Sequence, residues 1–170
     1  VTGGTGTDTL ELASTVTGSV SLDGTTLSGI EVVDASAVTG DLTLTGNAET
    51  ATTFVLGAGA ATVTGGTGDD TLELTSDFTG TSVTLAASDG QYNNIEVVDA
   101  SAVTGSLNIT GTAAAETITG AAGGGTIDGK GGADVLAGGN GNDTFMFYGS
   151  ETVTGGTGTD TLELASTVTG

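Results

Sequence analysis

The sequence contains no cysteine, proline, histidine or tryptophan, and Lys130 is its one basic residue. The absence of cysteine excludes a disulfide framework, and it fits an extracellular protein that does without disulfides as well as a cytosolic one. No basic segment followed by an apolar one begins the chain, and no apolar run is long enough for a transmembrane helix. Because the chain resembles a fragment of something larger, the missing signal peptide says little about the full protein.

Positive charge is almost absent, so the formal net charge is −20, from 21 acidic residues against one basic residue. Nothing in the chain neutralises phosphate, which excludes nucleic acid as a partner. The polyanionic surface also repels anionic membranes, and we expect no membrane insertion. Such a charge needs counter-ions, and hard divalent cations are the obvious ones.

Aromatic residues are scarce as well, at 4% of the chain, whereas 32 glycines are present. A thick core is therefore excluded, but a thin one forms if Val, Leu and Ile stack in regular columns. Their regular recurrence argues against a disordered acidic tail.

Internal repeats organise the whole chain. Residues 1–18 recur without change at 153–170, so the chain covers one unit of 152 residues and the start of the next. A near copy lies at 63–74, and the segment IEVVDASAVTG occurs at 30–40 and again at 95–105. We therefore divide the chain into solenoid repeat A (1–62), solenoid repeat B (63–110), a nonapeptide β-roll (111–152) and the start of the next unit (153–170).

Apolar residues recur every 9 to 12 positions within short alternating stretches such as Leu10-Glu11-Leu12. Alternation predicts strands with one buried face, and Gly, Asp and Asn separate them as turns. Repeats of fixed direction favour stacking of like on like, whereas abundant Gly and Thr disfavour helices. The predicted fold class is all-β, a right-handed parallel β-solenoid of the β-roll or β-helix type. Related blocks start six and nine strands apart, which favours a three-sided coil in the long-step regions, while the nine-residue steps of 111–146 favour two sides.

A repeated nine-residue motif contains the candidate metal-binding residues. From residue 111 the chain reads GTAAAETIT, GAAGGGTID, GKGGADVLA and GGNGNDTFM, and the last matches G-G-x-G-x-D-x-U-x, where U is a large apolar residue. The pattern is also complete at Gly3–Glu11, Gly65–Glu73 and Gly155–Glu163. Glycine permits tight turns in which carbonyls converge, and Asp adds the charge that Ca²⁺ prefers. Carboxylates stacked about 5 Å apart repel by about 3 kcal/mol per pair, so we expect folding to be coupled to calcium.

These nonapeptides resemble the RTX (hemolysin-type) calcium-binding repeats. The resemblance implies that the first six residues form a calcium-binding turn and the last three a short strand. It implies that Leu10, Leu72, Leu136, Phe145 and Leu162 point inward. The predicted calcium ligands are the carboxylates of Asp8, Asp70, Asp134, Asp143, Asp160 and Glu116, and turn residues Gly3, Thr5, Gly65, Thr67, Gly129, Gly131, Gly138, Asn140, Gly155 and Thr157.

With two strands per coil, nonapeptides two apart share a side. Glu116 then stacks under Asp134, Gly125 under Asp143, and Asp143 below Asp160. Gly125 occupies an Asp position, which weakens or removes one site. Lys130 replaces the second glycine of its turn, and we expect its ammonium to extend into solvent rather than to replace a cation.

Other polar residues have simpler interpretations. Asp34 and Asp99 follow strands and are predicted to bond their own turn backbone. The pairs Thr7/Thr9, Thr43/Thr45 and Thr62/Thr64 predict exposed threonine ladders, although no long unbroken array of the kind that binds ice is visible. Glu11, Glu73 and Glu163 are expected to face solvent, and Phe145, Phe147 and Tyr148 to form a local core or strand-edge cluster.

The DASAVTG elements beside the nonapeptides resemble bacterial surface-layer proteins and giant RTX adhesins, which in that family are exported by type I secretion. The resemblance implies a calcium-rigidified extracellular or cell-surface rod that self-associates head-to-tail or laterally into a filament, sheath or surface layer, with cell-surface polysaccharide as a further partner. The alternatives are an adhesin stalk or a ligand- or ice-binding module, and the calcium-binding carrier region of a secreted hydrolase. Without His, Cys or Arg, a hydroxyl nucleophile has no evident base, so we expect no enzymatic activity.

Overall fold

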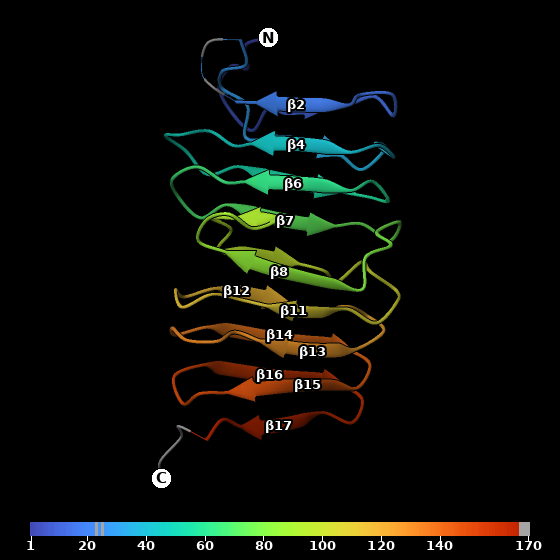
Figure 1. Ribbon diagram of the computed structural model, residues 1–170, viewed down its shortest axis with the longest axis vertical. Helices are drawn as coiled ribbons and strands as arrows, with labels where there is room; N and C mark the ends of the chain where they lie inside the picture. Colours follow the sequence, from blue (N-terminus) through green and yellow to red (C-terminus); the bar gives the residue numbers. More distant parts are fainter. Residues whose placement is uncertain (23, 25, 167–170) are drawn as a thin grey trace.

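A computed structural model describes residues 1–22, 24 and 26–166. Its regular elements within these ranges are all strands. Each coil contributes a strand to each of two parallel sheets, and one coil adds a second, short strand to the nine-stranded sheet. Figure 1 shows the coils stacked along one long axis, with the two ends of the chain at opposite ends of the stack. The predicted parallel β-solenoid is confirmed.

One sheet has eight strands, all paired in parallel. In spatial order they are β1 (Thr9–Glu11), β3 (Val32–Ala35), β5 (Thr53–Leu56), β7 (Thr71–Leu74), β10 (Val97–Asp99), β12 (Thr117–Thr119), β14 (Val135–Asn140) and β16 (Thr152–Thr157).

The opposite sheet has nine strands. They are β2 (Gly18–Ser21), β4 (Leu42–Thr45), β6 (Ala61–Thr64), β8 (Ser82–Ala86), β9 (Tyr92–Asn93), β11 (Asn108–Thr110), β13 (Gly125–Asp128), β15 (Asp143–Phe147) and β17 (Thr161–Leu164). The short β9 lies between β6 and β8, because Tyr92 pairs with both Val63 and Leu85.

The cross-section is two-sided throughout the described residues, so the three-sided coil predicted for the long-step regions is wrong. The extra residues of those coils lengthen the turns and do not form a third strand. Residues 46–52 between β4 and β5, for example, contain no strand.

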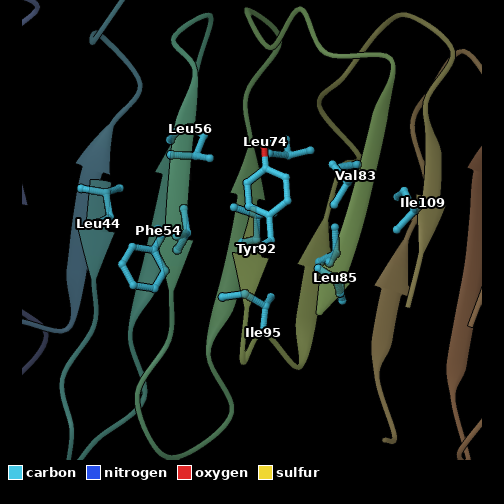
Figure 2. Close-up of a cluster of buried hydrophobic side chains, with 14 of the residues drawn as sticks. Leu44, Phe54, Leu56, Leu74, Val83, Leu85, Tyr92, Ile95 and Ile109 are labelled. Carbon is cyan, nitrogen blue, oxygen red and sulfur yellow. The ribbon is translucent and has the colours of Figure 1, made fainter. Parts of the chain in front are cut away.

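The core is a single layer of apolar side chains between the two sheets. In β7, Leu72 and Leu74 are both 0% exposed, while Glu73 between them faces solvent. Figure 2 shows such side chains, among them Phe54 and Tyr92, following one another along the axis. Full burial of each large aliphatic side chain stabilises the fold by about 1.5–3 kcal/mol.

Coils near the ends of the stack are less well covered. Leu162 lies in register with the buried Phe145, so it belongs to the inward column as predicted. Its side chain is nevertheless 49% exposed, because β17 pairs with a neighbour on one side only. Leu10 in β1 is half-buried for the same reason.

Identical sequences occupy opposite sheets. The Thr-Leu-Glu segment at 9–11 forms β1 of the eight-stranded sheet, whereas the same segment at 161–163 lies in β17 of the nine-stranded sheet. The start of the second 152-residue unit is therefore displaced by half a coil from the start of the first.

Outward-facing residues also form columns. Thr43 stacks on Thr62 and Thr45 on Thr64, as the predicted ladders require. On the eight-stranded sheet, an unbroken column of threonine and valine crosses every strand, which the sequence interpretation missed because the step between strands varies. We call it the Thr/Val column; it consists of Thr9, Val32, Thr53, Thr71, Val97, Thr117, Val135 and Thr152.

Membrane-spanning helices do not occur in the described part of the chain, since none of its elements is a helix of the required length and apolar character.

Candidate metal centre

The nonapeptide turn that ends at Asp70 closes around its own carboxylate. The Gly66 amide donates a hydrogen bond to Asp70 Oδ2 at 2.8 Å. A Cβ atom on Gly65 would lie 2.6 Å from Asp70 Oδ2 and still closer to the carbonyl oxygen of Asn94 in the next coil. Glycine is therefore required at the first motif position because two oxygens approach it, one from its own turn and one from the coil that follows.

The same convergence of a carboxylate and a carbonyl recurs at other first positions of the motif. At Gly138 both oxygens would lie 2.5 Å from an added Cβ, and at Gly111 they would lie 2.7 and 2.8 Å from it. The oxygen pairs are Asp143 Oδ2 with the Gly155 carbonyl, and Glu116 Oε2 with the Gly129 carbonyl.

A column of acidic residues runs along the eight-stranded sheet, one residue before each strand. The parallel register places these residues in line from coil to coil, and all of them except Thr52 are acidic. The acidic column consists of Asp8, Glu31, Thr52, Asp70, Glu96, Glu116, Asp134 and Glu151.

Backbone amides connect neighbours in this column. The amide of Asp8 donates to Glu31 Oε2 and that of Asp70 to Glu96 Oε2, both at 2.9 Å. The amide of Glu116 donates to Asp134 Oδ1 at the same distance. The carboxylates of Glu31, Glu96 and Asp134 thus each accept a hydrogen bond from the coil that precedes them.

The predicted stacking of Glu116 under Asp134 agrees with the register, which also brings the predicted ligands Asp8 and Asp70 into the same line; sequence reasoning missed Glu31, Glu96 and Glu151. A signal for the first two was present, because each glutamate directly precedes a strand in the repeated Ile-Glu-Val-Val segment. Glu151 lies outside that segment, and its carboxylate accepts hydrogen bonds from the amides of Tyr148, Gly149 and Ser150.

A second, shorter column lies on the nine-stranded sheet. Gly125 aligns with Asp143, and Asp143 with Asp160, as predicted. The Asp143 amide donates to Asp160 Oδ1 at 3.1 Å, which repeats the contact pattern of the acidic column. Gly125 offers no side chain, so this column of carboxylates begins at Asp143.

Burial raises the pKa of Asp70, Glu116, Asp134 and Asp143. For Asp143 the charge of Asp160 raises the pKa further, and for Asp70 the amides of neighbouring turns lower it without cancelling the effect of burial. The folded protein therefore disfavours negative charge at Glu116, Asp134 and Asp143 unless a cation compensates it, whereas at Asp70 two backbone amide donors offset part of the cost of burial.

Several residues that were predicted to form calcium-binding turns lie in extended strands instead. Gly138 and Asn140 lie within β14, and Gly155 and Thr157 within β16, so these strands run into the motif. The Thr157 hydroxyl donates to Asn140 Oδ1 at 2.9 Å across the two coils.

The other predicted turn residues lie where consecutive coils touch. The Thr67 hydroxyl donates to the Ala48 carbonyl at 2.7 Å, and the Gly131 amide donates to the Thr112 carbonyl at 3.1 Å. Thr5 is exposed in the first turn.

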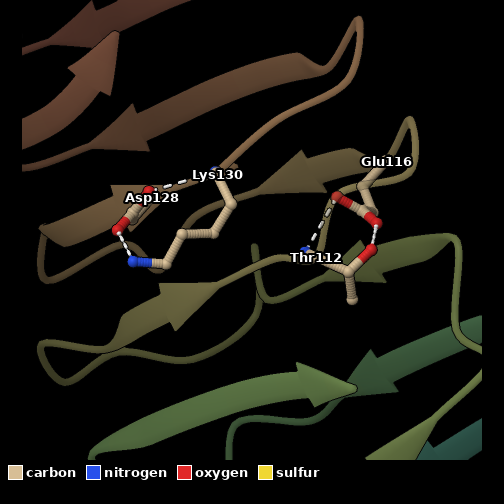
Figure 3. A network of polar contacts seen from close by, with 4 residues as sticks. All are labelled: Thr112, Glu116, Asp128 and Lys130. Carbon is tan, nitrogen blue, oxygen red and sulfur yellow. Dashed lines mark hydrogen bonds and ion pairs between the residues drawn. The ribbon is translucent and has the colours of Figure 1, made fainter. Parts of the chain in front are cut away.

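Lys130 and Asp128 form an ion pair beside the acidic column, with 2.7 Å between Nζ and Oδ2 (Figure 3). The Lys130 side chain is 49% exposed, but its ammonium pairs with Asp128 instead of extending freely into solvent as expected. Nearby, both the amide and the hydroxyl of Thr112 donate to the Glu116 carboxylate.

Asp34 and Asp99 are turn formers, as predicted. Asp34 Oδ1 accepts the Ser36 amide and Asp99 Oδ1 the Ser101 amide, each at 2.9 Å. Glu11, Glu73 and Glu163 face solvent, also as predicted.

Buried oxygens without donors test whether calcium fits. Asp134 Oδ2 and both carboxylate oxygens of Asp143 have no hydrogen-bond partner among the described residues, although these side chains are 1% and 2% exposed. No three acidic side chains in that part of the chain converge on one point, so backbone carbonyls must complete any site. A donor set made only of oxygen suits Ca²⁺, which supplies the missing positive charge when bound.

Comparison with known families agrees with this geometry. A family model for the RTX calcium-binding nonapeptide repeat matches in four copies, over residues 55–74, 110–145 and 147–164. The chain carries RTX calcium-binding nonapeptide repeats. These RTX repeats alternate along the solenoid with coils that the family model leaves unmatched, including those of Glu31 and Glu96. Neither the curated proteins nor the solved structures contain a match.

Proposed function

We propose that this chain is a calcium-stabilised structural repeat of a secreted or cell-surface protein, and that it assembles into an extracellular filament, sheath or surface layer without catalytic activity. The observation that carries the proposal is the recurrence of the first twelve residues at 153–164, where they contribute β17 to the same continuous stack. A unit whose next copy continues the same stack of coils is suited to repetition along one axis.

Calcium supports this role through the carboxylate columns. Neighbouring carboxylates in stacked coils repel by about 3 kcal/mol per pair at 5 Å, and a bound Ca²⁺ turns that repulsion into attraction. Extracellular sites of this type bind at about 10⁻⁴–10⁻³ M, the concentration of calcium outside cells. The rod would therefore become rigid in the extracellular space, where calcium is abundant enough to fill these sites.

Self-association is the proposed partner interaction. Among the described residues, β1 and β17 each pair with one strand only, so each presents an open backbone edge. Such edges accept a further parallel strand, from the next unit of the same chain or from another chain.

Electron microscopy of the 170-residue protein tests the proposal. We expect filaments or sheets in millimolar calcium, and their loss when a chelator is added. Equal concentrations of magnesium serve as the control, since Mg²⁺ demands a smaller octahedral site. Short monodisperse particles in calcium would show instead that the chain acts as a stalk or spacer.

A second candidate function is binding of an ordered ligand such as ice or cell-surface polysaccharide, and the Thr/Val column favours it. This column is uninterrupted across eight strands and lies on a regular sheet. Inhibition of ice recrystallisation by the wild-type chain, abolished by Thr117→Lys, would support this candidate. No inhibition by the wild type would exclude ice as the ligand.

A further inference from the structure

Asp70, Asp134 and Asp143 offer a matched comparison between turns of the two carboxylate columns. The three side chains are 0%, 1% and 2% exposed, so water reaches none of them. They differ in which backbone amides point at their carboxylates.

Asp70 is fully paired by the protein. Its Oδ1 accepts the Thr52 amide at 2.7 Å, and its Oδ2 accepts the Gly66 amide at 2.8 Å. Its own amide donates to Glu96 of the next coil, so the turn is linked on both sides by neutral backbone donors. The first turn shares one of these contacts, from the Gly4 amide to Asp8 Oδ2.

Asp134 lacks the equivalent donor because its turn is rearranged. Lys130 occupies the motif position of Gly66, but its amide donates to Asp128 Oδ1 at 3.0 Å. Lys130 also has a φ of 70°, in the left-handed region that glycine would adopt more readily. Asp134 Oδ2 is consequently left without a partner among the described residues.

Asp143 lacks the donor for another reason. The residue at the corresponding motif position, Gly139, lies within β14 and is paired with Gly156 of β16. Neither Asp143 oxygen accepts a well-formed hydrogen bond in the described part of the chain; the Gly125 amide approaches closely enough to lower the pKa of this carboxyl, but burial and the charge of Asp160 in the next coil outweigh it. A buried carboxylate in this state is stable only with a cation or a proton.

We propose that the chain contains two classes of acidic turn: turns that require calcium, at Asp134 and Asp143, and a turn closed by backbone amides without an ion, at Asp70. This inference rests on the proposed calcium-stabilised role and refines it. It also runs against the sequence rule, because the turn at Asp70 matches the RTX pattern at every position whereas the turn at Asp134 departs from it at Lys130. The requirement for calcium is thereby concentrated in the part of the rod that follows residue 111.

The isosteric variants Asp70→Asn, Asp134→Asn and Asp143→Asn of the whole chain test the inference, with calcium alone as the titrant in calorimetry. We expect Asp134→Asn and Asp143→Asn each to lose bound calcium and to raise the calcium midpoint about tenfold or more, since affinity follows the number of charged ligands. Asp70→Asn, the matched control, keeps the wild-type stoichiometry and shifts the midpoint by less than about twofold. Loss of calcium from Asp70→Asn equal to that from Asp143→Asn would overturn the two classes while leaving the calcium-stabilised role intact. A wild type that takes up no calcium would overturn both.

Hydrogen exchange on the wild-type chain gives a reading that does not depend on variants folding. In chelator, the amides of Thr52 and Gly66 should remain protected, while those of residues 129–143 should exchange until calcium is restored. If both regions lose and regain protection at the same calcium concentration, the turns form one class and the inference fails.

Discussion

Gly65 and Gly4 obey the same nonapeptide rule but have different surroundings. An added Cβ on Gly65 would lie 2.6 Å from Asp70 Oδ2, and the Asn94 carbonyl is closer still. At Gly4 nothing lies within 4 Å of an added Cβ. The first position is therefore filled in the Asp70 turn, and the second is open in the first turn; in the Asp70 turn the second position, Gly66, is also filled, by the carbonyl oxygen of Asn47.

We expect Gly65→Ala to lower the free energy of unfolding by about 1–3 kcal/mol, because backbone oxygens cannot move aside as a flexible side chain can. Gly4→Ala should change it by less than about 0.5 kcal/mol. Denaturant titrations in saturating calcium give both values. Equal effects would show that these turns need glycine for its conformational freedom and not for space.

Asp99 tests the turn formers separately from the acidic column. Asp99→Ala removes the hydrogen bond to the Ser101 amide and should cost about 0.5–1.5 kcal/mol. The calcium midpoint should stay at the wild-type value, because Asp99 lies after its strand and not before it. A raised midpoint in the calorimetric titration would place Asp99 among the calcium ligands.

At the scale of the strand, neighbours on both sides decide how much an apolar residue contributes. Leu72 in β7 is 0% exposed between two flanking strands, whereas Leu162 in β17 is 49% exposed. We expect Leu72→Ala to cost about 2–5 kcal/mol. Leu162→Ala removes the same atoms and should cost clearly less. Thermal unfolding of the two variants in calcium measures both effects. A similar loss of stability would mean that β17 is covered in solution, for example by another copy of the chain.

The strands and their facing were predictable from the sequence, because alternation in segments such as Leu10-Glu11-Leu12 reports which side chains are buried. The stacking of Glu116 under Asp134 was predictable too, since nine-residue steps leave only one register. The pairing of strands in the coils with steps longer than nine residues was not predictable, because the additional residues can extend a turn or build a third strand with the same periodicity. Glu31 and Glu96 were missed for this reason: their place in the acidic column appears only once the register of β3 and β10 is known.

At the scale of the molecule, calcium removal is the most direct test. A chelator should reduce the β-sheet circular dichroism signal, and added calcium should restore it, because the buried carboxylates at Asp134 and Asp143 lose their compensating charge. The loss should be partial, since coils before residue 111 contain carboxylates that the backbone already pairs. A spectrum that excess chelator leaves unchanged would contradict the coupling of folding to calcium.

The metal-free rod should respond to pH in the opposite direction from most proteins. Burial raises the folded-state pKa of Asp70, Asp134 and Asp143 above the ordinary value of 3.8, so the folded chain holds protons more tightly than the unfolded chain. This contribution to stability is fully present below pH 3.8 and is lost as the pH rises through the raised folded-state values.

In chelator, the melting temperature should therefore be higher at pH 5 than at pH 7.5. In saturating calcium the order should reverse, because the ligands must be ionised to bind the ion. A metal-free chain that gains stability between pH 5 and pH 7.5 would show that its carboxylates are stabilised as anions by the protein itself.

If the proposed rod repeats the 152-residue unit, the half-coil offset between β1 and β17 would relate successive units by a screw operation, with half a rotation for each translation. The true period of such a rod is two units, and any bend that one unit introduces is opposed by the next. The rod is then straight on average, and the Thr/Val column appears alternately on two opposite flanks. An object with equivalent flanks can bind neighbours on both sides, which is the symmetry required for growth in two dimensions as well as along the axis.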